Sequence, residues 1–427
     1  MQGDFSRNSF DPRNQFLRVL HQQGRVQLDA DVNEQTSILL HYLQTLAHDL
    51  IGDAAGPKHN CGFEITHGAL AKKPSKKSPA PKEDFWISRG RYYVDGLLCE
   101  NPENVLLTHK LSTFPQLVYL DVWEQYVSAD DQVDIAEPAL EGVATTARSK
   151  VSWLVRCTSW EGDKFDRDKW ETKLDEWQPD DRGQLLVKPV ATTAMDVGDV
   201  EDDVDAAAAY TGENQLYRVE IHQGGAAGNE ATFKWARDNG SNTYPIVSIS
   251  GPTVTISSAG RDELRGLKQG SVVELIEPQS PGDSDPAANP KPLFTVKTPP
   301  NADGILVLSG VPANVPASGS YLRRWDHVSV DGNSAIPLVE GQWIELEHGL
   351  AVMFQASKGS TYRRLDYWMI AARPGIGAAI WRHSKQDAIP APPDGIEHHY
   401  APLAIIGAGN VLEPLTREFA AIGHVGP

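Results

Sequence analysis

Short apolar runs, separated by glycine- and proline-rich turns, recur from about residue 84 to the C-terminus. Residues 118–123 form a strand-length run that is apolar on both faces, whereas 151–157 and 254–257 place apolar residues at alternate positions. The 36 glycines and 29 prolines of the chain favour short strands over long helices. The sequence therefore predicts a mainly β, multidomain chain of small β-sandwich or barrel modules with one prominent N-terminal α-helix.

The spacing of these runs predicts four regions. Residues 1–56 form an N-terminal arm and helix, and residues 57–244 form a β-rich domain with an exposed lysine- and proline-rich loop at 72–82. Five short strands crowd into residues 245–325, which favours a small barrel-like module. Residues 326–427 form a C-terminal β region that we expect to pack with 57–244.

The predicted helix follows a short acidic segment. Asp31 and Glu34 have the spacing of a capping box, and Gly52 is a suitable stop. One apolar stripe, widened by Ile38 and Tyr42, follows at steps of four, three and four residues, formed by Leu39, Leu43, Leu46 and Leu50. Two interpretations stay open, because such a stripe packs either on its own domain or on a partner.

The first 30 residues carry aromatic and arginine side chains without a core-forming period. Arginine interleaved with aromatic residues is typical of protein interfaces. The sequence therefore predicts an assembly interface, with the alternative that the segment only covers its own domain. The candidate interface residues are Phe5, Arg7, Phe10, Arg13, Phe16, Arg18 and Arg25.

Charge and composition exclude several classes of protein. The formal net charge of −18 opposes binding to nucleic acid and to anionic membranes. No apolar run is long enough to span a membrane, and no secretory signal opens the sequence, so we expect a cytoplasmic chain without membrane insertion. Three widely spaced cysteines, Cys61, Cys99 and Cys157, predict buried thiols rather than disulfides.

No motif in the sequence predicts chemistry. His398 and His399 are the only adjacent histidines, and in an extended segment they point to opposite faces, so they cannot both bind one metal. Nucleophile elbows, phosphate-binding loops and zinc-binding helices are missing from the pattern. The sequence thus predicts no catalytic residue, no metal site and no cofactor, and indicates that the chain is not an enzyme.

The N-terminal sequence has a family resemblance. The segments GDFSR at 3–7, FDPR at 10–13 and VLHQQGRVQLDADVNEQ at 19–35 look like the opening of a bacterial family found with contractile injection systems. More loosely, they are similar to phage baseplate and virion structural proteins. Further similar blocks are YLDVWE at 119–124, YRVEIH at 217–222, FKWARDNGS at 233–241 and DGIEHHYAPL at 394–403. Many relatives carry an aromatic residue where this chain has Val32.

The resemblance implies a structural component of a contractile, phage-tail-like injection particle. Its partners would be other particle subunits, including further copies of the same chain, and it implies no catalytic residues. Two alternatives stay open. The eleven tryptophans and twelve tyrosines would suit a glycan- or receptor-binding appendage of such a particle. A polysaccharide-acting enzyme or an injected effector is the second alternative, and it would need two facing carboxylates.

Overall fold

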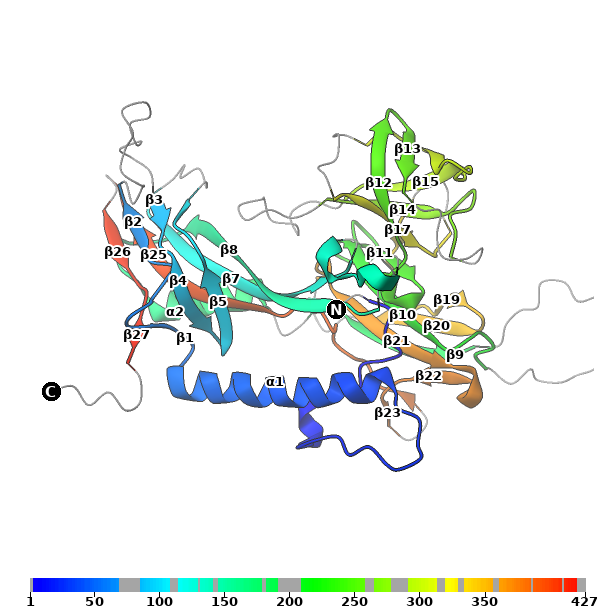
Figure 1. Cartoon of the computed structure of the whole chain (residues 1–427), viewed down its shortest axis with the longest axis horizontal. Helices are drawn as coiled ribbons and strands as arrows, with labels where there is room; N and C mark the ends of the chain where they lie inside the picture. Colours follow the sequence, from blue (N-terminus) through cyan, green and yellow to red (C-terminus); the bar gives the residue numbers. More distant parts are fainter. Residues whose placement is uncertain are drawn as a thin grey trace, which may run out of the picture.

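The computed structural model confirms the predicted fold class, with 43% of the chain in strands and 15% in helices. It describes residues 3–68, 85–107, 114–129, 131–140, 145–178, 182–190, 209–257, 265–277, 291–312, 319–328, 334–355, 361–384, 387–408 and 411–420. The predicted lysine- and proline-rich loop at 72–82 lies outside these residues. The described chain forms two lobes and a barrel, with one long helix along one side (Figure 1).

The first lobe contains the first and last strands of the described chain, β1 and β27, so we call it the terminal lobe. One sheet has the order β27-β1-β4-β5, a second has β26-β25-β7-β8, and a small third has β2-β3-β6. The bounds are β1 (Ala54–Pro57), β2 (Ile65–His67), β3 (Phe85–Ile87), β4 (Gly90–Val94), β5 (Leu97–Asn101), β6 (Val105–Leu106), β7 (Gln116–Val127), β8 (Arg148–Ser159), β25 (His398–Ile406), β26 (Leu412–Pro414) and β27 (Glu418–Phe419). Phe63, Cys99 and Leu120 lie in the core between the sheets.

The second lobe is built on the strand order β18-β11-β10-β21-β22, and we call it the central lobe. A sheet of order β19-β20-β9 packs beside it around Phe233, Phe354 and Trp368. The bounds are β9 (Gln184–Pro189), β10 (Gln215–Gln223), β11 (Thr232–Ala236), β18 (Ile336–Pro337), β19 (Ile344–Glu347), β20 (Leu350–Gln355), β21 (Tyr367–Arg373), β22 (Ala378–Ile380), and the separate pair β23 (His383–Ser384) and β24 (Asp387–Ala388). C-terminal strands thus pair with earlier ones in both lobes, β25 with β7 and β21 with β10.

A closed barrel rises from the central lobe. Its strand order is β12-β13-β16-β15-β14-β17, with β12 (Thr243–Ser250), β13 (Thr253–Ile256), β14 (Val272–Ile276), β15 (Leu293–Thr298), β16 (Ile305–Leu308) and β17 (Tyr321–Trp325). The sequence pattern identified only five of these strands. The sixth, β17, was missed because two arginines interrupt its apolar run, and it closes the barrel by pairing with both β12 and β14.

Two α-helices lie on the outside of the sheets. Helix α2 (Arg167–Trp177) falls within a charged segment and begins at Asp166, whose carboxylate accepts the Asp168 and Lys169 backbone N–H groups. Trp170 anchors α2 by its buried ring.

Helix α1 (Asp29–Ile51) ends at Gly52 as predicted. The predicted capping box is wrong, because α1 begins two residues before Asp31 and its N-cap, Leu28, makes no side-chain bond. The helix runs along the side of the molecule, from the central lobe at its N-terminus to the terminal lobe at its C-terminus (Figure 1).

Candidate functional site

The outward face of helix α1 is apolar and exposed. The four leucines of the predicted stripe, Leu39, Leu43, Leu46 and Leu50, are 53%, 57%, 41% and 58% exposed. Tyr42 beside them is 63% exposed. Leucine has a high helix propensity, but a continuous row of leucines in water forfeits the gain from burial. The stripe therefore does not pack on its own domain in this structure, which removes the first of the two interpretations.

The inward face of α1 fits closely against the body of the protein. Ala30 and Ile38 are buried, so Ile38 belongs to this face and does not widen the outward stripe as predicted. Gly96, in the turn between β4 and β5, touches the helix so closely that a Cβ there would overlap the Gln44 carbonyl. The helix is thus fixed in orientation, with its leucines outward.

Polar contacts tie the N-terminal arm to α1. The Ser6 backbone N–H and hydroxyl donate to the Asp29 carboxylate at 2.8 and 2.6 Å, and the Ser9 hydroxyl donates to Glu34 at 2.6 Å. Glu34, the second member of the predicted capping box, is thus bonded to the arm and not to its own helix terminus. The Arg373 guanidinium on β21 donates to the Ser6 carbonyl at 2.7 Å, which fixes the arm to the central lobe.

The structure divides the predicted interface residues into two groups. Phe5 contacts Tyr126 edge-on with ring centroids 6.0 Å apart, and Phe10 lies 5.7 Å from the His41 ring, so both are used within the chain. Phe16 is 59% exposed, and Arg13 forms an exposed pair with Asp11 at 2.5 Å. Arg18 and Arg25 are also exposed, whereas Arg7 is half-buried. An assembly role for the seven residues stays a prediction.

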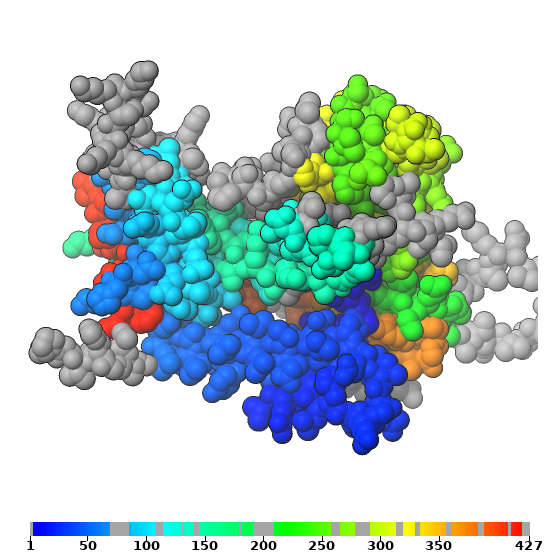
Figure 2. Space-filling view, in the orientation of Figure 1, coloured from blue at the N-terminus to red at the C-terminus, as the bar shows by residue number. Residues whose placement is uncertain are grey.

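The second half of the arm adds to the apolar surface of the helix. Its large exposed side chains are Phe16, Leu17, Leu20 and Val26, from 59% to 85% exposed. Figure 2 shows the arm and helix together along one edge of the molecule. We call this combined surface, formed by residues 16–28 and the outward face of α1, the arm–helix surface. Exposed apolar side chains gathered on one edge of a folded protein are typical of interaction sites.

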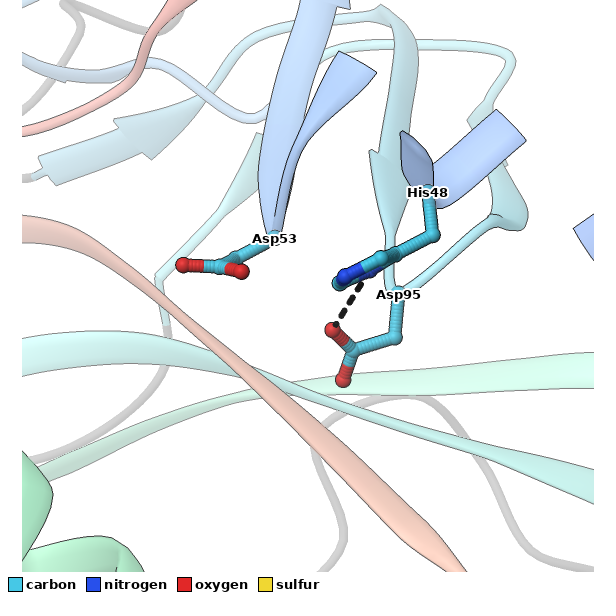
Figure 3. A group of neighbouring side chains, drawn as sticks. All are labelled: His48, Asp53 and Asp95. Atoms are coloured by element: carbon cyan, nitrogen blue, oxygen red, sulfur yellow. Dashed lines mark ion pairs between the residues drawn. The ribbon is translucent and has the colours of Figure 1, made fainter. Parts of the chain in front are cut away.

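A cluster of ionisable side chains lies where α1 meets the terminal lobe. His48, Asp53 and Asp95 place their ligand atoms within 4.8 Å of one another (Figure 3). The His48 Nδ1 lies 3.5 Å from Asp95, and the His399 Nδ1 lies 3.0 Å from the other Asp95 oxygen. Burial lowers the pKa of His399, but the Asp95 carboxylate outweighs burial and raises it. His48, Asp53 and Asp95 could hold a metal, with His399 bonded to Asp95 beside them, and the spread of these positions along the chain hid them from motif analysis.

The neighbouring histidine points the other way, as predicted for an extended segment. His398 Nδ1 lies 2.6 Å from Asp121 on β7, whereas His399 faces Asp95. The two imidazoles therefore have different partners and cannot bind one ion together.

The seam between the central lobe and the barrel contains a second ionisable cluster. Lys234 on β11 is 1% exposed and pairs with Glu274 of the barrel at 2.7 Å and with Glu220 on β10 at 3.2 Å. Arg218 pairs with Glu220 at 2.7 Å, and the Trp325 indole N–H donates to Glu274 at 3.0 Å. Burial opposes the charge on Glu220, but Lys234 and Arg218 outweigh it and lower its pKa to about 2. The Glu220 carboxylate is thus held ionised and enclosed by its partners, and removing one partner would be costly.

Aromatic and thiol side chains are largely enclosed. None of the eleven tryptophans, all of which lie in the described part of the chain, is fully exposed; six are buried and five are half-buried. Cys99 is buried, while Cys61 and Cys157 are half-buried, and all three thiols are free. Burial raises the thiol pKa to about 11 for Cys61 and about 12 for Cys99 and Cys157, so none is an activated nucleophile.

The fold and its surface define a mainly β, multi-module protein with one helix presented outward. Among the described residues, no helix is both long and apolar enough to cross a membrane. The chain belongs to a family of unknown function, DUF6519, whose model matches residues 1–116 and 191–422. The matched ranges include the arm, helix α1 and the four residues of the His/Asp cluster. No curated protein and no solved structure matches the chain.

Proposed function

We propose that this chain is a structural, non-enzymatic subunit of a contractile, phage-tail-like particle that assembles through the arm–helix surface. The observation that carries the proposal is the exposed leucine stripe on α1. Its four leucines expose 41% to 58% of their surface on a helix that is firmly held from behind. The N-terminal sequence resemblance supplies the particle context.

The spacing of the stripe favours another helix as the partner. Positions 32, 36, 39, 43, 46 and 50 repeat at steps of four and three, which is the pattern of a coiled-coil seam. Five of these six residues are apolar, and Thr36 is the exception. Such a seam places side chains of one helix into the gaps of a second helix at a shallow crossing angle.

The residues that flank the stripe favour a second copy of this chain as the partner. In a helical pair, the flanking positions meet across the interface, and like charges there oppose self-association. Here the flanks are Asn33, Leu40 and Ala47 on one side and Gln35, Tyr42 and Asp49 on the other. They carry a single charge, so two copies of α1 can approach each other with little repulsion.

The arm provides the test of incorporation into a particle. Deleting residues 2–24 removes the exposed Phe16 and Leu20. The contacts to the body that are lost with them are polar bonds and edge contacts between rings. The truncated chain should therefore fold and keep its melting temperature within a few degrees. Particles collected by sedimentation from cells producing the chain would be examined for sheath and tube proteins. The full chain should cosediment with them, and the truncated chain should not.

The comparison needs a matched control. Val247 and Val328 are 66% and 78% exposed and lie away from the arm–helix surface. Their double substitution by glutamine should leave incorporation unchanged. If the truncated chain is incorporated normally, if truncation unfolds it, or if the full chain is absent from sheath-bearing particles, the proposal is wrong.

A further inference from the structure

The His/Asp cluster joins four elements that are far apart in the sequence. His48 lies in the last turn of α1, Asp53 precedes β1, Asp95 lies in the turn between β4 and β5, and His399 lies on β25. Backbone pairing fixes the two acidic residues, because the Asp95 N–H donates to the Asp53 carbonyl at 2.8 Å. The cluster is therefore held by the fold itself.

We propose that this cluster binds one divalent transition-metal ion of the Zn²⁺ type through His48, Asp53 and Asp95, with His399 orienting the Asp95 carboxylate from behind. One imidazole and two carboxylates, completed by a water molecule, are a ligand set that Zn²⁺ accepts in tetrahedral coordination. With a neutral imidazole the three ligands carry two negative charges, which a divalent ion balances. This inference does not depend on the proposed assembly function.

The positions of the ligand atoms support a shared ion. Asp95 lies between the two histidines, with one carboxylate oxygen 3.5 Å from His48 Nδ1 and the other 3.0 Å from His399 Nδ1. Zinc–nitrogen and zinc–oxygen bonds are about 2.0–2.2 Å long, so an ion draws the ligand atoms inward by small side-chain rotations. His48 and Asp53 are open to solvent, with side chains 44% and 70% exposed, so an ion can enter.

One competing contact must give way. The Arg167 guanidinium lies 4.0 Å from Asp53, at the limit of an ion pair. Arg167 is 69% exposed and has a better partner in Glu171, at 3.0 Å on the same helix. Releasing Asp53 therefore costs little, since a long ion pair between two exposed side chains contributes little to stability.

Binding would have a structural consequence. Gly52 and Gly96 border the cluster with φ angles of +86° and +79°, so the chain turns sharply on both sides of the ligands. An ion bridging His48 to Asp53 and Asp95 would fix the C-terminal end of α1 to the terminal lobe. The metal would thus add stability to the folded state by mass action.

Titration of the full-length, metal-free protein with ZnCl₂, followed by calorimetry, tests the proposal. Wild type should bind one ion per chain and melt several degrees higher when saturated with Zn²⁺. Asp95→Asn keeps a residue suited to the turn, so the variant should fold, yet it should bind at least tenfold more weakly. His399→Ala should show the same loss.

Two controls separate this site from other zinc ligands. His41 lies on the same helix but outside the cluster, and Cys61 is a half-buried free thiol. His41→Ala and Cys61→Ser should both bind Zn²⁺ like wild type. Circular dichroism establishes that each variant is folded. Absence of wild-type binding at 100-fold excess of Zn²⁺ over protein, or binding by folded Asp95→Asn and His399→Ala that equals wild type, would overturn the proposal.

Discussion

The seam between the central lobe and the barrel buries charges, whereas helix α1 exposes leucines. Lys234, Glu220 and Glu274 are each at most 3% exposed, while Leu43 and Leu50 are 57% and 58% exposed. Both arrangements oppose the usual preference of these residue types. In the seam, the cost of burying charges is offset within the chain, because every buried charge has a partner of opposite sign. Helix α1 leaves its leucines exposed among the described residues, and this exposure is the ground for the proposed partner.

The comparison predicts opposite responses to substitution. In the seam, Lys234 is shared by Glu220 and Glu274, and removing it leaves two buried carboxylates with less compensating charge. On α1, a polar substitution replaces an exposed leucine and removes nothing that the isolated chain uses. Stability should therefore respond strongly in the seam, whereas association should respond on the helix.

The largest effect is expected at Lys234. Lys234→Met leaves Glu220 and Glu274 facing each other in a closed environment and should lower the free energy of unfolding by about 3–5 kcal/mol. Urea denaturation followed by tryptophan fluorescence would measure the change. Lys169→Met on α2 is the control, because Lys169 forms only an exposed pair with Glu161 and should cost at most about 1 kcal/mol. A loss at Lys234 as small as that of the control would contradict this account of the seam.

A slightly smaller effect is expected from acid, through His222. Burial lowers the pKa of His222 from 6.5 to about 4, and the nearby Lys234 ammonium adds to the shift. The unfolded chain takes up a proton below pH 6.5, but the folded chain does so only near pH 4. The His222 contribution is therefore fully present above pH 6.5 and is lost as pH falls to 4, by about 3 kcal/mol in total.

A substitution isolates this contribution from other titrating groups. His222→Gln cannot take up a proton, so its stability should fall less between pH 6.5 and 4 than that of wild type. The difference between the two unfolding free energies, measured by urea denaturation at each pH, should grow steadily as the solution is acidified. Parallel pH profiles for the two proteins would show that His222 is not excluded from water as the structure indicates.

Much of the fold could be predicted from the sequence because strand periodicity and turn residues act locally. The run at 118–123 became the buried part of strand β7, and Asp95-Gly96 became the turn between β4 and β5. The predicted capping box failed because its glutamate, Glu34, is bonded by Ser9, which lies more than 20 residues away. Strand β17 escaped prediction because Arg323 and Arg324 interrupt its apolar run.

The candidate sites depended even more on long-range contacts. The leucine stripe of α1 was clear in the sequence, but its exposure could not be predicted. Periodicity shows that the leucines share one face of the helix, and it does not show what packs against that face. The seam joins residues from positions 218 to 325, and the His/Asp cluster joins positions 48 to 399. Neither has a local spacing, so neither could be recognised before the chain was folded.

The central claim is that the leucine stripe of α1 packs against a second copy of the chain. Analytical ultracentrifugation of the wild-type protein over a range of concentrations, beside Leu43→Gln/Leu46→Gln and the control Val247→Gln/Val328→Gln, tests it most directly. Glutamine keeps the helix propensity, so unfolding free energies should agree within about 0.5 kcal/mol. Wild type and control should reach a multiple of the chain mass, and the leucine variant should remain a monomer. A monomeric wild type at every concentration, or a leucine variant that associates as wild type does, would contradict the claim.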